Sequence, residues 1–534
     1  MKTAARSRKS LFWLVPITLV VLMVVFLVMP LIGMFANMDA ESIHQVLGND
    51  SFGDVIKRSV TASLLTTVIS IIIAYGMAWC TERSAMPGKK IFRLMVSLPM
   101  LIPSVSIGMG VVLLLGNNGI LTNLMGLETG NIYGLSGIVL GSVMYALPVA
   151  FLMIENILRY EDSAPYEAAT VLGIPKWKQF LTITVPYLRK PMIAVVFSVF
   201  TLSFTDYGVP LMVGGKYKTL PMLMYQEVIG QLNFGKGCVY GSILLIPAII
   251  AFMLDLANKN NANNTFVSQP FTIRRQRGRD AFAAVCSAVI SLFSVLPILA
   301  FLVLAFVKKY PSDMAFTLAN IVRAMELGGG KYLFNSVEIA LCVSVIGVIL
   351  AVLTAYYTAR TRLGLGKYLH LISMSMAAVP GIVLGLAYVL QFKGSPLYGT
   401  MAILIAVNVV HFFASPYLMI HATFSKMNEN LEAVAWTLGI GRKRVLLDII
   451  LPMCRHTVAE MFVYFFVNSM MTISAVSFLT NSRIKPVALM INQFEAQAQM
   501  EYAAVVSLAI LLVNLLIKIM LEWQPWKARN RKYC

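Results

Sequence analysis

The sequence predicts an all-α, polytopic membrane protein with about twelve transmembrane helices, arranged as two parallel six-helix repeats. Apolar residues make up 58% of the 534 residues and charged residues 13%, against about 45–50% and about 25% in ordinary soluble domains. Apolar runs of about 20 residues recur along the chain, and its mean hydropathy is +0.77. A matching segment in each half indicates the repeat.

The predicted spans follow from the thickness of a bilayer. A helix that crosses about 30 Å of hydrocarbon needs about 20 apolar residues, because each residue rises about 1.5 Å. Twelve segments meet this requirement, with predicted limits at residues 11–36, 60–80, 94–115, 134–157, 191–213, 238–257, 281–307, 336–359, 368–390, 401–424, 458–480 and 503–521.

The distribution of Lys and Arg predicts the orientation. With the N-terminus inside, the cytoplasmic segments hold 30 basic residues and the outside loops hold 12, while Lys518 lies within the last span. Short cytoplasmic loops carry such an excess, so both termini are predicted to be cytoplasmic. The membrane also explains the net charge of +19, which in a soluble protein would suggest a nucleic-acid partner. We expect the lipid bilayer as a partner and no nucleic acid.

The cysteines and histidines predict no metal site. The six cysteines form no C-x-x-C pair, and no two of the five histidines show the spacing of a metal pair on one helix. The cysteines are expected to be small packing residues in or beside the apolar runs.

A polar linker at residues 258–280 divides the chain into halves at 1–257 and 281–534. Each half carries one copy of a similar loop, at residues 164–190 and 430–456. Six spans separate the copies, so both lie on the cytoplasmic side and the repeats are parallel. Four pairs align without a gap at an offset of 266: Gly173 with Gly439, Ile183 with Ile449, Pro186 with Pro452, and Arg189 with Arg455.

The first loop is predicted to form a short helix, a glycine turn and a second short helix. Pro165 suits the start of the first helix, and Gly173 with Pro175 ends it. The second helix runs from Lys176 to the next span. One alternative is an amphipathic helix that only anchors the loop in the headgroups, but two copies with identical spacing favour a binding role.

The repeated segment resembles the EAA motif of the membrane subunits of bacterial ATP-binding-cassette importers. That motif reads E-A-A, three residues, G, nine residues, I, one residue, L, P. The first copy departs from it at Val185, whereas the second has Ala433 at the glutamate position and Glu432 one residue earlier. The segments SFTDYGVPLMVGG at 203–215 and MTISAVSFL at 471–479 are similar to the fused permeases of ferric-iron, 2-aminoethylphosphonate and thiamine importers.

The resemblance implies a type I importer permease in the bacterial inner membrane, which forms the solute pore and performs no chemistry. Its implied partners are a cytoplasmic ATPase dimer and an extracytoplasmic solute-binding protein. Its implied solute is ferric iron or a phosphonate such as 2-aminoethylphosphonate. The residues that would couple the pore to the ATPase are Glu167, Ala168, Ala169, Gly173, Ile183, Pro186, Glu432, Ala433, Ala435, Gly439, Ile449 and Pro452.

The sequence agrees that ATP binds elsewhere. None of the Gly-Lys dipeptides is followed by Ser or Thr, so the phosphate-binding loop pattern is missing. No cofactor is expected in this chain, and the ATPase would hold ATP and Mg. The longest predicted outside loop, residues 308–335, is too short to form a solute-binding domain.

Asp206 is the one acidic residue deep within a predicted span, and Gly208 and Pro210 follow it as helix breakers. These three residues and Ser474 are candidates for the translocation path. Alternatively, a neighbouring hydroxyl or backbone amide satisfies Asp206, which then only fixes helix packing. In a different class of protein, a secondary transporter driven by an ion gradient, Asp206 would be the coupling site. A membrane-embedded enzyme would need clustered polar residues, which the sequence does not display.

Two substitutions would test the coupling assignment. We expect Gly173→Pro or Glu167→Arg to leave the protein inserted and to abolish its association with the ATPase. Normal ATP-driven uptake in these variants would contradict the assignment.

Overall fold

The computed structural model describes residues 14–126, 132–259, 269, 271–361, 364–428 and 430–530. The basic residues before residue 14, most of the predicted linker and Cys534 lie outside the described residues. The chain packs into two compact units. Unit 1 comprises residues 1–40, 325–490 and 509–534, and unit 2 comprises residues 41–324 and 491–508.

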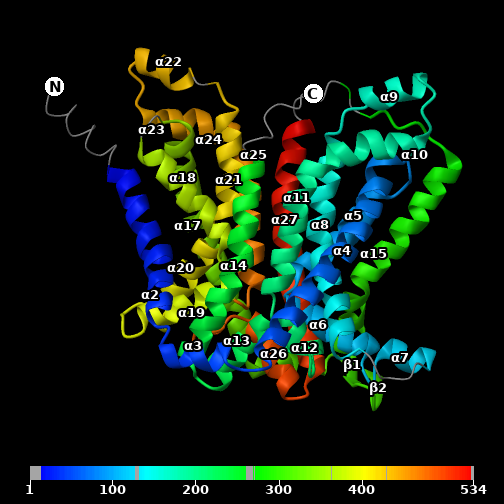
Figure 1. The fold of residues 1–534 in the computed structure, drawn as a ribbon, viewed down its shortest axis with the longest axis vertical. Coiled ribbons are helices and arrows are strands. Elements are labelled where there is room, and N and C mark those ends of the chain that lie inside the picture. The colour runs from blue at the N-terminus through cyan, green and yellow to red at the C-terminus, as the bar shows by residue number, and fades with distance from the viewer. Residues whose placement is uncertain are drawn as a thin grey trace. The chain divides into compact units, whose positions relative to one another are not determined.

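Every secondary-structure element in the described residues of unit 1 is a helix (Figure 1). It begins with a helix at Leu14–Ala36 that includes α2, Met29–Ala36. The others are α17 Gly330–Ala359, α18 Leu365–Ser375, α19 Gly381–Phe392, α20 Met401–Phe412, α21 Ala414–Ser425, α22 Leu431–Thr437, α23 Arg442–Arg444, α24 Leu451–Met453 and α25 Arg455–Met471.

Unit 2 contains helices and one small hairpin. Its helices are α3 Ala40–Leu47, α4 Phe52–Arg83, α5 Lys89–Ser97, α6 Ser104–Leu115, α7 Ile120–Met125, α8 Leu135–Arg159, α9 Ala164–Val171, α10 Lys176–Gln179, α11 Val185–Thr205, α12 Gly208–Val213, α13 Leu220–Tyr225, α14 Phe234–Lys259, α15 Arg277–Ala305 and α16 Ala319–Ala324. The antiparallel hairpin joins β1 Val307–Lys309 to β2 Asp313–Phe316. Both units share α26 Ala488–Ala496 and α27 Met500–Asn530.

The described residues contain nine helices long and apolar enough to span a membrane, and three bent helix pairs that bring the total to twelve when each pair counts as one span. This agrees with the predicted number. The predicted fifth span at 191–213 is wrong in its limits, because the helix runs over Lys176–Thr205 and stops at Asp206. Gly208 therefore does not break the helix but opens the next one, α12.

Small residues let the helices of unit 2 approach closely. Ala74 and Ala78 of α4 and Ala146 and Ala150 of α8 are all buried in one cluster with residues of α11. In lipid, helix association depends on such close packing because burying apolar surface there gives little driving force. This cluster holds together the helices at whose ends the first repeated loop begins and finishes.

The first span of each half packs with helices of the other half. In unit 2, Pro297 of α15 lies where a side chain on Gly110 of α6 would be. In unit 1, the Tyr388 hydroxyl donates to the carbonyl oxygen of Phe26 at 2.7 Å, and the Phe26 and Phe392 rings stack at 5.7 Å. The grouping in space thus differs from the sequence division at residues 258–280, because packing follows complementary surfaces rather than order along the chain.

The repeat is visible in local geometry. A 3₁₀ turn at Leu98–Leu101 and a proline precede α6, and a 3₁₀ turn at Met376–Ala378 and a proline precede α19. Helices α6 and α19 then begin and end at positions that differ by 277. Each proline sets an extended backbone before the helix, where its missing N–H costs nothing.

Candidate functional site

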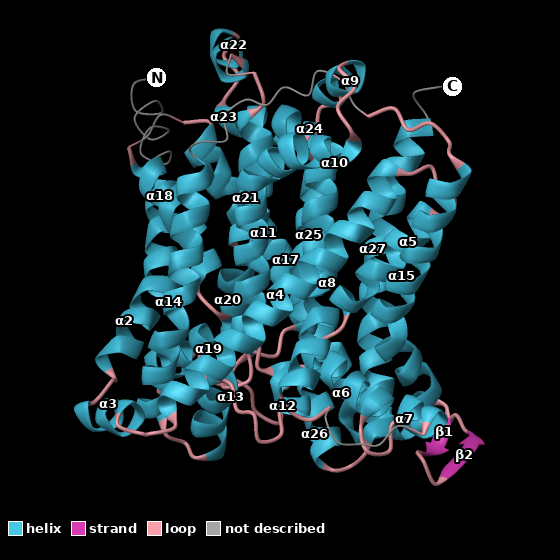
Figure 2. Cartoon of the chain, turned by 45° about the vertical axis from the view of Figure 1, so that its right-hand side comes forward, coloured by secondary structure: helices cyan, strands magenta, loops and turns pink. Residues whose placement is uncertain are grey.

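The first repeated loop forms the predicted helix, turn and helix. Helix α9 ends in a left-handed residue, Gly173, with φ of +70°. The Ile174 N–H donates to the Ala169 carbonyl at 2.9 Å, and the Gly173 N–H donates to the Thr170 carbonyl at 3.1 Å. This pair of bonds is the Schellman cap, which satisfies carbonyls at a helix end. Within unit 2, α9 lies at the opposite end from α7 and the hairpin (Figure 2).

The second loop repeats this cap. Gly439 has φ of +72°, the Ile440 N–H donates to the Ala435 carbonyl at 2.8 Å, and the Gly439 N–H donates to the Trp436 carbonyl at 3.1 Å. Apart from the adjoining residues, no atom in the described part of the chain lies within 4 Å of where a Cβ on Gly173 or Gly439 would be. The backbone conformation, and not lack of space, therefore requires glycine at both positions.

This geometry predicts different outcomes for two neighbouring glycines. Gly439→Val forces a branched residue into the left-handed region, whereas Gly441 has φ of −72° and equally open surroundings. We expect Gly439→Val to cost at least about 1–2 kcal/mol of local stability and to lower sharply the ATP-driven transport that the sequence resemblance implies. Gly441→Val is the matched control and should retain transport. Equal transport by the two variants would contradict a requirement for the cap.

Both loops expose large apolar side chains. Val171 is 88% and Leu172 76% exposed at the end of α9, and Trp436 is 82% and Leu438 69% exposed at the end of α22. Leu172 and Leu438 occupy equivalent positions of the repeat. Ala168 and Ala433 are also exposed, whereas Ala169 and Ala435 are buried beneath their helices. Exposed apolar groups of this kind at the end of a helical loop are typical of protein-binding surfaces.

The second part of each loop widens into a π-helical turn before its proline. These turns cover Phe180–Thr184 and Val445–Ile450, and they contain the half-buried Ile183 and Ile449. Pro186 and Pro452 follow in the first turn of the next helix. Because each π-helical turn runs directly into that helix, the proline lies within a continuous helical stretch and removes one N–H from its hydrogen-bond ladder.

The two loops differ at the glutamate of the motif. Glu167 is exposed near the start of α9 and accepts a hydrogen bond from the Ser163 hydroxyl at 3.1 Å. Glu432 instead faces Arg360, whose Nε donates to its Oε1 at 2.8 Å. Ala433, at the position equivalent to Glu167, carries no charge. Glu432 is therefore committed to an ion pair within the chain.

One arginine anchors each loop. In unit 2, Arg83 of α4 donates to the Leu158 carbonyl at 2.7 Å and pairs with Glu161 at 2.5 Å. In unit 1, Arg360 is paired with Glu432 and donates to carbonyls at the end of α21 and in the loop after it: Phe424 at 3.4 Å, Met427 at 3.0 Å and Asn428 at 2.8 Å.

The sequence analysis missed both anchors. Arg83 and Arg360 are separated by 277, the offset that also relates the two prolines before α6 and α19. This offset was the signal that could have revealed them. Their carboxylate partners do not correspond in the repeat, because Glu161 lies just before the first loop and Glu432 lies within the second, so no shared motif marks the pairs.

The end of the linker covers the anchor in unit 2. The Phe271 ring lies under the Arg83 guanidinium at 3.8 Å and beside the Tyr166 ring at 5.2 Å. The Ser163 N–H donates to the Gln269 carbonyl at 2.9 Å. Burial, and then the carboxylate of Glu161 that accepts its hydrogen bond, raise the pKa of Tyr166. The hydroxyl therefore stays protonated as a donor.

Phe271→Ala should loosen the first loop. The substitution removes a cation–π contact worth about 0.5–2 kcal/mol and the ring that packs on Tyr166. We expect faster hydrogen exchange over residues 163–172, with the second loop unchanged. Phe282→Ala, which removes an exposed ring of the same unit, is the control. Unchanged exchange over residues 163–172 in Phe271→Ala would contradict a supporting role for the linker.

Asp206 is held by groups of its own unit. Its carboxylate accepts hydrogen bonds from the Ser104 hydroxyl at 2.6 Å and the Val209 N–H at 2.9 Å. This is the arrangement expected for a packing role. Asp206 also lines a cavity of about 10 Å³, which has room for about one water molecule. The buried Pro210 and hydroxyl-bearing residues such as Ser63 line the same cavity.

Gly208 and Ser474 take part in equivalent close contacts. A Cβ on Gly208 would lie 2.3 Å from Ser104 Oγ, and a Cβ on Gly381 would lie 2.4 Å from Ser474 Oγ. Gly208 and Ser474 are related by the offset of 266, and Ser104 and Gly381 by the offset of 277. The two halves thus make the same close approach with serine and glycine exchanged.

Two histidines that are distant in sequence lie together in unit 1. The ring centroids of His370 and His421 are 4.7 Å apart, and His370 Nδ1 lies 2.5 Å from the Tyr417 hydroxyl. The equivalent positions in unit 2 hold the ion pair of Arg93 with Glu155, with Nε and Oε1 2.8 Å apart. Over the described part of the chain, no cluster of three or more His, Cys, Asp or Glu side chains could hold a metal ion.

Comparisons with known proteins cover most of the chain. Residues 70–259 match the family described as binding-protein-dependent transport system inner membrane component. A ferric transport system permease protein FbpB of Actinobacillus pleuropneumoniae is 24% identical over 95% of this chain and 77% of its own length. A putative ferric transport system permease protein FbpB 1 of Haemophilus influenzae is 24% identical over 87% of this chain and 77% of its own length.

A third relative is similar to this chain over nearly the full length of both proteins. The thiamine transport system permease protein ThiP of Escherichia coli is 22% identical over 97% of this chain and 98% of its own length. Residues 70–259, which include the first repeated loop, are thus similar to the binding-protein-dependent transport inner membrane component family, and the multi-pass membrane chain resembles fused ferric and thiamine transport permeases along most of its length.

Proposed function

We propose that this chain is the permease subunit of an ATP-driven, binding-protein-dependent importer. It would form the solute pore and pass conformational change between that pore and a separate cytoplasmic ATPase. The observation that carries the proposal is the pair of repeated loops, each with the same glycine cap and an exposed apolar helix end. A transporter driven by an ion gradient has no use for two such matched surfaces.

The proposed partners are an ATPase dimer at the two loops and a solute-binding protein on the other side of the membrane. The excess of Lys and Arg supports placing both loops and both termini in the cytoplasm. ATP and Mg would be held by the ATPase, because the sequence of this chain has no phosphate-binding loop. The chain itself would act as a transport subunit without catalytic residues.

The anchors provide the route by which loop movement would reach the membrane. In unit 2, Arg83 ties the base of the first loop to the ends of α4 and α8, and the Tyr166 hydroxyl lies 2.6 Å from that of Thr184, just before α11. In unit 1, Arg360 joins the end of α17 to α21 and α22. A force on either loop would therefore act on several spans at once rather than on a flexible connection.

Ferric iron is the proposed solute, because two relatives that match most of this chain are permeases of ferric transport systems. The thiamine permease makes thiamine the second solute to test, and 2-aminoethylphosphonate the third. Asp206, Gly208, Pro210 and Ser474 remain the proposed lining of the path, with Asp206 held in place by Ser104.

Co-purification tests the proposal. The tagged chain is isolated from its native membrane, the proteins bound to it are identified, and ATP hydrolysis is measured as candidate solute-binding proteins are added. We expect two ATPase copies per chain and stimulation by one binding protein, whose solute is then identified. The proposal would be overturned if the chain purified alone and its solute uptake were driven by an ion gradient. Asp206 would then be the first residue to replace.

A further inference from the structure

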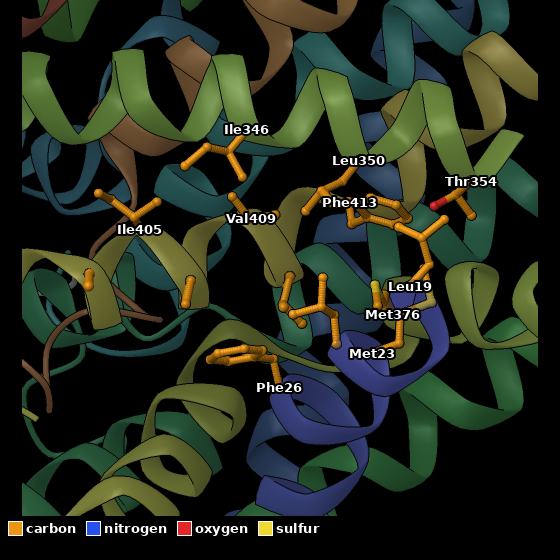
Figure 3. A pocket seen from close by; sticks show the side chains of 14 residues that line it. Leu19, Met23, Phe26, Ile346, Leu350, Thr354, Met376, Ile405, Val409 and Phe413 are labelled. Atoms are coloured by element: carbon orange, nitrogen blue, oxygen red, sulfur yellow. The ribbon is translucent and has the colours of Figure 1, made fainter. Parts of the chain in front are cut away.

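Unit 1 contains an apolar pocket of about 380 Å³ between the N-terminal helix, α17 and α20 (Figure 3). Its floor includes the buried side chains of Leu19, Met23 and Phe413. Leu22 and Ile346 at its rim are 36% and 42% exposed. The pocket is therefore open at the surface of helices that span the membrane, where the surrounding solvent is lipid.

One polar group lies in this pocket. Thr354 is buried, and its Oγ1 has no hydrogen-bond partner among the described residues. Among the described residues that line the pocket, Thr354 alone carries a hydroxyl, amide or charged group. A buried hydroxyl without a partner carries a desolvation cost, which a ligand with an acceptor oxygen would remove.

The length and direction of the pocket indicate the ligand. Thr354 and Ile346 mark opposite ends of the wall formed by α17 (Figure 3), and the helix rises about 12 Å between them. One leaflet of a bilayer has about 15 Å of hydrocarbon, half of about 30 Å. Helix α17 ends at Ala359, five residues after Thr354, and the proposed orientation places that end in the cytoplasm. The hydroxyl thus lies toward the headgroup side of the cytoplasmic leaflet.

We propose that this pocket binds one acyl chain of a diacyl phospholipid from the cytoplasmic leaflet. The chain lies along Ile346, Leu350 and Ile405, and the Thr354 hydroxyl donates to the ester carbonyl at its head. The bound chain fills the gap between the N-terminal helix and α20, and so fixes that helix on unit 1. The proposal depends on placement in the membrane and not on the identity of the solute or of the ATPase.

Native mass spectrometry of the full chain, purified in mild detergent, tests this site. Ala406→Phe places a ring in the pocket wall, and Ala422→Phe makes the same change at an exposed position of α21 outside the pocket. We expect wild type and Ala422→Phe to retain one phospholipid, and Ala406→Phe to lose it. Equal retention by the two variants would overturn the site.

A second variant protects the test against misfolding. Thr354→Val keeps the shape of the side chain and removes the donor, so the protein should remain folded. Its retention of phospholipid should fall by about fivefold, as expected for the loss of one neutral hydrogen bond. Rebinding of phospholipid to the purified chain is then tested with vesicles of phosphatidylethanolamine and phosphatidylglycerol. An adduct whose mass is that of detergent or another apolar molecule, or unchanged retention in Thr354→Val, would overturn the assignment to an ester-linked chain.

Discussion

Arg360→Met is expected to detach the second loop from the rest of unit 1 and to abolish most ATP-driven transport. The arginine side chain is 3% exposed, pairs with Glu432 and donates to three backbone carbonyls. Removing one member of a buried pair costs about 3–5 kcal/mol, because the other charge is left without a partner. Local unfolding of α22 should therefore become measurable by hydrogen exchange over residues 428–440.

The matching double variant separates charge from packing. In Arg360→Met with Glu432→Leu, no charge is left unpaired, so part of the lost stability should return. The carbonyls at the end of α21 still lack their donor, and recovery should be incomplete. Full transport in Arg360→Met alone, or no difference between the single and double variants, would show that this pair does not anchor the loop.

Gly208→Ser should disrupt the packing of α12 on α6. A Cβ at this position would lie 2.3 Å from Ser104 Oγ and 2.8 Å from the backbone nitrogen of Val105. The backbone cannot move away cheaply in a closely packed interior, so we expect a loss of stability of about 1–3 kcal/mol or more. The measurement is the temperature at which the detergent-solubilised protein loses its monodisperse elution profile.

The other half of the repeat supplies the control for this substitution. Ser104→Gly with Asp206→Thr and Gly208→Ser reproduces, in unit 2, the residues Gly381, Thr472 and Ser474 of unit 1. This triple variant should be more stable than Gly208→Ser alone, because the clash with Ser104 is removed. If Asp206 is needed only for packing, the triple variant should also transport. A stable triple variant without transport would assign Asp206 to the solute path.

Much of the fold could be predicted because it depends on local pattern. Apolar length determines the spans, and the left-handed turns at Gly173 and Gly439 require glycine wherever the loop is placed. The two loops could be paired from the sequence because their matching residues keep a constant offset of 266. The break at Asp206 was expected in this region, but its position depends on contacts with Ser104 and Val209 that the sequence does not display.

The rest of the site depends on contacts between distant segments. Arg83 and Arg360 are ordinary basic residues at the ends of spans until their carbonyl and carboxylate partners are known. Phe271 lies in a polar linker, where nothing in the pattern shows that it packs on Arg83 and Tyr166. The packing of each half's first span on helices of the other half likewise depends on contacts between distant residues, such as that of Gly110 with Pro297.

Cross-linking from the two loops tests the central claim most directly. A photoreactive residue is placed at Leu172 or at Leu438, which are equivalent and exposed, and the native membranes are illuminated. Leu124, exposed in α7, is the control on the side predicted to face outward. We predict that both loop positions give a covalent adduct with an ATPase subunit and that Leu124 gives none. Adducts with lipid alone at both loop positions, in membranes that contain the ATPase, would contradict the proposed coupling role.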